Sequence, residues 1–98
     1  MNQTPPPLGL GPVSINNPVF NCIVHVLRDS GGNVSARVAN LPNIVCTAST
    51  ERVVLTKIVS EFKQVVKEHS EKGSAIPWID PPSSKEPNEQ TRFIPVHL

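Results

Sequence analysis

The sequence predicts an α+β protein with a three-stranded antiparallel meander, one long helix and a short fourth strand. Three observations lead to this prediction. Residues 18–48 contain three strand-like segments with turn and breaker residues between them. Residues 51–72 repeat apolar side chains at the period of a helix. Residues 74–79, SAIPWI, are extended and apolar, which predicts the short fourth strand.

The first strand is expected over residues 18–28, PVFNCIVHVLR, which are rich in Val, Ile and Phe. Both of its faces are partly apolar, which suits a strand that is covered on one side and half covered on the other. One face carries Phe20, Cys22, Val24 and Val26, and the other carries Asn21, Ile23, His25 and Leu27.

A turn at residues 29–32, DSGG, leads into the second strand, because Asp and Gly tolerate the backbone angles of tight turns. Residues 33–40, NVSARVAN, alternate most clearly, with Val34, Ala36 and Val38 on one face. Leu41-Pro42 ends this strand because proline donates no ladder hydrogen bond. Residues 44–48, IVCTA, form the expected third strand.

The helix is expected to begin after Ser49 or Thr50, since either hydroxyl can cap a first-turn amide. It ends at Gly73, a residue type common in left-handed helix caps. Burial of one large aliphatic side chain contributes roughly 1.5–3 kcal/mol, which outweighs the weak helix propensity of valine. The apolar face consists of Val54, Leu55, Ile58, Val59, Phe62, Val65, Val66 and His69.

The ends of the chain differ in composition from its middle. Residues 1–18 carry five of the eleven prolines and are expected to form a disordered tail. Residues 19–79 form the expected domain, and residues 80–98 form a polar linker and an apolar tail. We expect the tail from Phe93 to Leu98 to be ordered against its own sheet or against another chain, because so small a core gains from added strands.

Charge and cysteine content make several classes of protein less favoured. A net charge of +1 with interspersed acids and bases gives no electrostatic footprint for nucleic acid or membrane. The sequence shows no secretory signal and no apolar run that would span a bilayer. Cys22 and Cys46 are expected to be buried thiols, with a disulfide or a metal pair as alternatives. These features predict a cytoplasmic protein.

The sequence predicts no catalytic residue, no metal site, no cofactor and therefore no enzyme. His25, His69 and His97 lack the spacing that brings histidines together on a metal. No two carboxylates are paired in an apolar setting, as general acid–base chemistry requires. The Ser49-Thr50 pair has no glycine-flanked elbow, and DSGG lacks the lysine of a phosphate loop.

Binding is the alternative to catalysis. A short meander leaves an edge strand whose unpaired backbone groups suit strand addition. Two arginines flank the hairpin, and the C-terminal RFIPVHL carries strand-like apolar side chains. The candidate partner-binding residues are Arg28, Arg37, Phe93, Ile94 and Val96.

The middle of the chain resembles the HicB-like antitoxin family, which has a truncated RNase H-like fold. The resemblance covers residues 19–79. It rests on the strand from Phe20 to Arg28, the Gly31-Gly32 hairpin, the segment Val34–Val38 leading to Leu41-Pro42, the segment Ile44–Thr47, the helix positions Thr50, Leu55, Ile58 and Phe62, and the exit strand at Ile76-Pro77. The chain departs from the family at Asn43, where glycine is usual, and at Ala48-Ser49, where Gly-Asp is usual. Its helix start, TERVV, is less acidic than that of the family.

The resemblance implies a module that binds and blocks a small HicA-like RNase. It does not imply DNA binding, because residues 80–98 are too short and proline-rich for the C-terminal DNA-binding domain common in the family. Two alternatives remain open. One is a stand-alone homo-oligomeric HicB-like domain with a structural or regulatory role, and the other is a nucleic-acid-binding protein.

Overall fold

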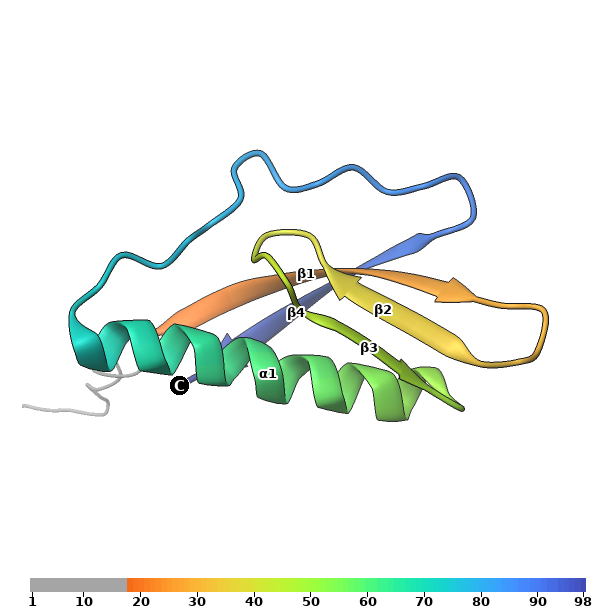
Figure 1. Cartoon of the computed structure of the whole chain (residues 1–98), viewed down its shortest axis with the longest axis horizontal. Helices are drawn as coiled ribbons and strands as arrows, with labels where there is room; N and C mark the ends of the chain where they lie inside the picture. Colours follow the sequence, from red (N-terminus) through yellow and green to blue (C-terminus); the bar gives the residue numbers. More distant parts are fainter. Residues whose placement is uncertain (1–17) are drawn as a thin grey trace, which may run out of the picture.

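The computed structural model describes residues 18–98 and shows an α+β fold, as predicted (Figure 1). Of the predicted N-terminal tail, residues 1–18, only Pro18 lies within the described residues. The elements are, in chain order, β1 (Val19–Arg28), β2 (Val34–Val38), β3 (Val45–Ala48), α1 (Glu51–Lys72) and β4 (Gln90–His97).

The four strands form one antiparallel sheet in the order β3-β2-β1-β4. The turn between β1 and β2 is closed by Asp29, whose Oδ1 accepts hydrogen bonds from the amides of Gly31 (2.9 Å) and Asn33 (3.0 Å). Gly32 adopts a φ of 86°, a value that glycine reaches without steric cost. The predicted meander of three strands is therefore present.

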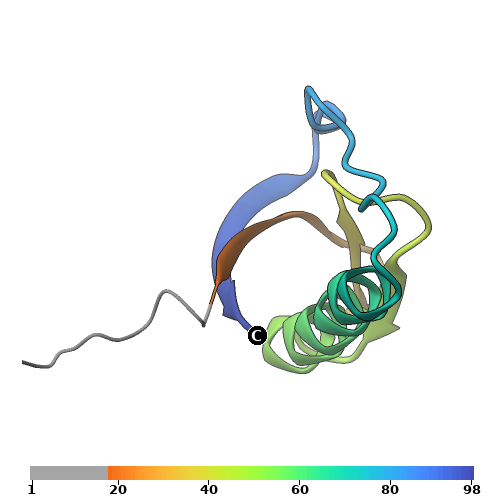
Figure 2. The same ribbon diagram turned by 90° about the vertical axis from the view of Figure 1, so that its left-hand side faces the viewer.

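Helix α1 has the predicted caps. The Oγ1 atom of Thr50 accepts a hydrogen bond from the amide of Val53 at 3.2 Å, and Gly73 ends the helix with a φ of 67°. Helix α1 lies against one face of the sheet (Figure 2), mostly over β2 and β3, and its apolar face packs into the core. The fully buried helix residues are Val54, Ile58, Phe62 and Val66.

The core lies between α1 and one face of the sheet, here called the inner face. The strand residues that point into it alternate along each strand, as the predicted faces require. The buried strand side chains of the core are Cys22, Val24, Val26, Val34, Ala36, Val38, Cys46 and Val96.

The predicted strand at residues 74–79 is absent, and this part of the prediction is wrong. Pro77 has no amide to donate, and the amide of Trp78 bonds locally to the carbonyl of Ile76 at 2.8 Å. The indole of Trp78 stacks on Phe20, with ring centroids 5.7 Å apart. The apolar residues of this segment therefore pack against the end of the core and do not join the ladder.

The fourth strand comes from the C-terminal tail. Every residue of β4 is paired with β1, from Gln90 opposite Val26 to His97 opposite Val19. The prediction that the tail is ordered against a sheet is thus confirmed, and the folded unit extends past residue 79 to the end of the chain.

Residues 74–89 connect α1 to β4 and are called the strap here. The strap crosses the sheet on the side opposite α1 (Figure 1). The amide of Ile79 bonds to the carbonyl of Asn40 at 3.1 Å, and that of Ser83 bonds to Ala39 at 2.9 Å. This route brings the chain back to the start of β4.

Candidate functional site

The sheet face turned away from α1, here called the outer face, carries the candidate site. Odd-numbered residues of β1 and β4 point to this face, because alternate side chains of a strand face opposite ways. The strap covers the half of the outer face around His25 and Arg37, which lie opposite each other in the register of β1 and β2. The other half, around Phe93, is open to solvent.

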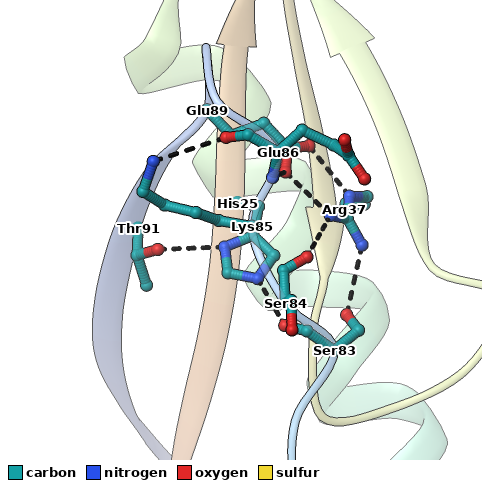
Figure 3. Close-up of polar contacts among 8 residues, drawn as sticks. All are labelled: His25, Arg37, Ser83, Ser84, Lys85, Glu86, Glu89 and Thr91. Atoms are coloured by element: carbon teal, nitrogen blue, oxygen red, sulfur yellow. Dashed lines mark hydrogen bonds and ion pairs between the residues drawn. The ribbon is translucent and has the colours of Figure 1, made fainter.

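A polar cluster joins the strap to the covered half (Figure 3). Arg37 donates from Nε to Glu89 Oε2 (2.8 Å) and from Nη2 to Glu89 Oε1 (2.7 Å). It also donates from Nη1 to the Ser83 hydroxyl (3.1 Å) and from Nη2 to the Ser84 carbonyl (2.9 Å). One guanidinium therefore holds three residues of the chain after α1.

His25 occupies the next position of the cluster and is only 5% exposed. Its Nε2 lies 2.7 Å from the carbonyl oxygen of Ser83, which can only accept, so Nε2 carries the proton. Its Nδ1 lies 3.0 Å from the hydroxyl of Thr91 on β4. Strand β1, the strap and β4 are thus linked through one imidazole ring.

The buried carboxylate of Glu89 is the electrostatic centre of the cluster. The side-chain hydrogen bonds from Arg37 lower the pKa of Glu89 to about 2, against the opposing effect of burial. The same pairing raises the pKa of Arg37. The amide of Glu86 also donates to Glu89 Oε1 at 2.7 Å. Glu89 is therefore ionised at neutral pH.

The cluster fastens the strap to the outer face of the sheet. Both ring nitrogens of His25, three guanidinium nitrogens of Arg37 and both carboxylate oxygens of Glu89 have partners within the chain. The pocket beside the cluster, about 210 Å³, is lined by His25, Leu27, Ser35, Ala36, Arg37, Val45 and Glu89.

The open half of the outer face carries four apolar residues, with the polar side chains of Asn21 and His97 among them. Phe93 is 70% exposed and lies opposite Ile23, while Val19 at the start of β1 is 52% exposed. Pro95 lies between them on β4 and is exposed. We call Val19, Ile23, Phe93 and Pro95 the outer patch. A pocket of about 280 Å³ adjoins it, lined by Ile23, Asn40, Trp78, Ile79, Asp80 and Pro82.

The five residues predicted to bind a partner lie in different surroundings. Phe93 belongs to the outer patch, and Arg28 is a surface residue at the end of β1, 3.9 Å from Glu51. Arg37 is engaged by Glu89. Ile94 and Val96 point to the inner face, where Val96 is 2% exposed, so their side chains pack in the chain's own core.

Glu89, Ser83 and Thr91 form the cluster with His25 and Arg37, but the sequence did not indicate them. One feature of the sequence pointed to a polar cluster: His25 and Arg37 are polar residues on the strand face that was expected to be half covered. Their partners lie 46 to 66 residues later in the chain, in a segment without periodicity. No local pattern identifies such contacts.

Cys22 and Cys46 are buried free thiols, as the leading prediction states. Burial raises the pKa of Cys22 to about 12. Burial, together with a hydrogen bond from Cys46 to Glu61, raises the pKa of Cys46 to about 11. Both thiols are therefore protonated at neutral pH, which lowers their reactivity.

Within residues 18–98, no group of three or more His, Cys, Asp or Glu side chains is placed to hold a metal ion. Across the same residues, no helix has the length and apolar character needed to cross a bilayer.

Comparisons with protein-family models, with curated proteins and with solved structures find no match to this chain.

Proposed function

We propose that the chain is a non-catalytic, cytoplasmic protein-interaction module that binds and blocks a small RNase through the outer patch. The observation that carries this proposal is the 70% exposure of Phe93 on a sheet face. A phenylalanine so placed contributes nothing to its own core, whereas burial against a partner would remove a large apolar surface from water.

The surroundings of Phe93 suit a protein partner. Ile23, Val19 and Pro95 add apolar side chains to the same face, and apolar side chains gathered on a surface are typical of protein-binding sites. Asp80 lines the adjoining pocket and adds a carboxylate at the margin of the patch. An apolar centre with an acid at its margin fits a small basic protein.

The RNase as partner rests on the resemblance to HicB-like antitoxins. The segments that carry the resemblance correspond to β1, β2, β3 and α1. Ile76-Pro77, which the resemblance assigns to the exit strand, lies in the strap. The proposal of a protein partner thus stands on the outer patch, and the identity of that partner stands on the resemblance.

The test is capture followed by an enzyme assay. The full chain, tagged, is used to recover partners from its native host, in parallel with Phe93→Ser. We expect wild type to recover a short basic protein that cleaves RNA and loses this activity when wild-type chain is added. Phe93→Ser should neither recover nor inhibit it.

Lys63→Ser is the matched control, because Lys63 is also exposed but lies on α1, on the other side of the sheet from the outer patch. It should behave as wild type. A recovered protein without RNase activity would disprove the antitoxin role, and equal recovery by wild type and Phe93→Ser would disprove the role of the outer patch.

A further inference from the structure

The two edges of the sheet differ in how well they are protected against another strand. In the β1–β4 ladder, the amide of Leu98 bonds to the carbonyl of Pro18, so even-numbered residues of β4 bond to β1. The backbone of Pro95 therefore faces outward, where it offers no amide. A proline at such a position is a common protection of sheet edges.

Strand β3 forms the other edge and has no such protection. The amide of Val38 bonds to the carbonyl of Ile44 at 3.0 Å, so Cys46 and Ala48 continue the ladder with β2. The amides and carbonyls of Val45 and Thr47 consequently point away from the sheet. Strand β3 contains neither a charged residue nor a proline, and Val45 is 66% exposed.

We propose that β3 pairs with β3 of a second copy of this chain, antiparallel across a two-fold axis, and joins the two sheets into one of eight strands. The proposal is independent of the partner at the outer patch. Within β3, only Val45 and Thr47 have backbone amides and carbonyls that point away from β2. To use the backbone groups of both residues, Val45 of each copy lies opposite Thr47 of the other. This register forms four new backbone hydrogen bonds and places the two Cys46 residues next to the axis.

The register is limited on one side by backbone conformation. Asn43 has a φ of 65°, which is left-handed and cannot continue a strand. The opposite direction is closed by the cap residue Thr50 and by α1. Four hydrogen bonds alone make a weak interface, so the neighbouring helices must contribute.

The position of α1 favours the second copy as the occupant of this edge. The helix lies mostly over β2 and β3, close to the open edge. With strands about 4.8 Å apart, an axis through the new β3–β3 pair places the two helices about 10 Å apart, on the same side of the sheet. Helices pack side by side at about 8–10 Å, so no gap remains between them.

On the side of α1 above β3, a positive and a negative side chain of one copy face the opposite charges of the second copy across the axis. Cys46, which lies next to the axis, donates a hydrogen bond to Glu61 at 3.2 Å, and Lys57 lies one helical turn before Glu61 on α1. We place the axis between these two helix residues, since Cys46 beside the axis contacts the turn that they span. Because a two-fold axis makes the helices antiparallel, Lys57 of each copy faces Glu61 of the other.

Sedimentation equilibrium of the full chain tests this dimer. We expect wild type to sediment as two copies at micromolar concentration. Thr47→Pro should weaken association at least about tenfold, because it removes an outward amide without cost to the β2–β3 ladder. His97→Pro is the matched control, since its amide also faces outward but on β4. It should leave the dimer unchanged.

A charge exchange provides a second test that does not introduce proline. Lys57→Glu and Glu61→Lys should each weaken the dimer about tenfold through like charges across the axis, and the double exchange should restore it. Circular dichroism verifies that each variant is folded. The proposal is overturned if wild type is monomeric at ~100 μM, if Thr47→Pro and His97→Pro act alike, or if the double exchange fails to restore association.

Discussion

Arg37 and Glu89 form a two-bond ion pair between the sheet and the strap, across 52 residues of sequence. The carboxylate side chain is 7% exposed and the guanidinium side chain 30%. The pair holds the end of the strap, directly before β4, against β2. Its energetic contribution can be measured directly.

Arg37→Met should lower the free energy of unfolding by about 2 kcal/mol, because it leaves the buried Glu89 carboxylate without its charged donor. Arg28→Met is the control, since the Arg28 side chain is 65% exposed and its nearest carboxylate oxygen is 3.9 Å away. It should change stability by less than about 0.5 kcal/mol. Urea unfolding followed by circular dichroism measures both. Equal effects of the two substitutions would contradict the role of the pair.

The ion pair also predicts an acid-dependent loss of stability. Because the folded-state pKa of Glu89, about 2, lies below its ordinary value of 4.5, the pair stabilises the fold fully above pH 4.5. This contribution disappears as the pH falls toward 2. Glu89→Gln should therefore be less stable than wild type at pH 7, and the difference should shrink on acidification. A difference that stays constant from pH 7 to pH 2 would exclude this linkage.

The N-terminal cap of α1 predicts a position-specific effect of removing a threonine hydroxyl. Thr50→Ala should cost about 1 kcal/mol, because the amide of Val53 loses its acceptor. Thr56→Ala removes a hydroxyl that bonds only to a helix carbonyl, at Arg52, and should be neutral or stabilising by a few tenths of a kcal/mol. Thermal unfolding of both variants distinguishes the cap from a general effect of threonine.

The C-terminal strand is part of the core, so shortening it should destabilise the protein. Val96→Ala should cost about 2 kcal/mol because the valine is buried against the inner face. Truncation after Asp80 removes all of β4 and should lower the melting temperature further or change the oligomeric state. Phe93→Ser lies on the same strand but is exposed, and should cost less than about 1 kcal/mol. Equal melting temperatures of wild type and truncated chain would show that β4 is dispensable.

The local pattern of the sequence predicted most of the fold. A strand buries every second side chain, and a helix buries side chains about every 3.6 residues. These spacings are visible in the sequence over residues 18–48 and 51–72, so both regions could be assigned from the sequence. Thr50 and Gly73 act through local geometry, so their residue types indicate their positions. These elements therefore appear in the structure where they were predicted.

Long-range pairing was not predictable in the same way. Apolar residues 74–79 satisfy a strand pattern but pack through Trp78 onto Phe20. The tail has the composition of a strand, but its partner β1 lies at the opposite end of the described residues, and no local pattern indicates such a pairing. In the candidate site, Phe93 was predicted as a binding residue because the C-terminal segment RFIPVHL carries strand-like apolar side chains. The inward direction of Val96 follows only once the register with β1 is known.

Site-specific photo-crosslinking in the native host tests most directly whether the outer patch binds a protein. A photoreactive phenylalanine analogue replaces Phe93 in one strain and Lys63, on the exposed side of α1, in another. We predict that position 93 is joined to the same short basic RNase that the full chain recovers, and that position 63 is not. Equal crosslinking from both positions, or none from position 93, would contradict the account.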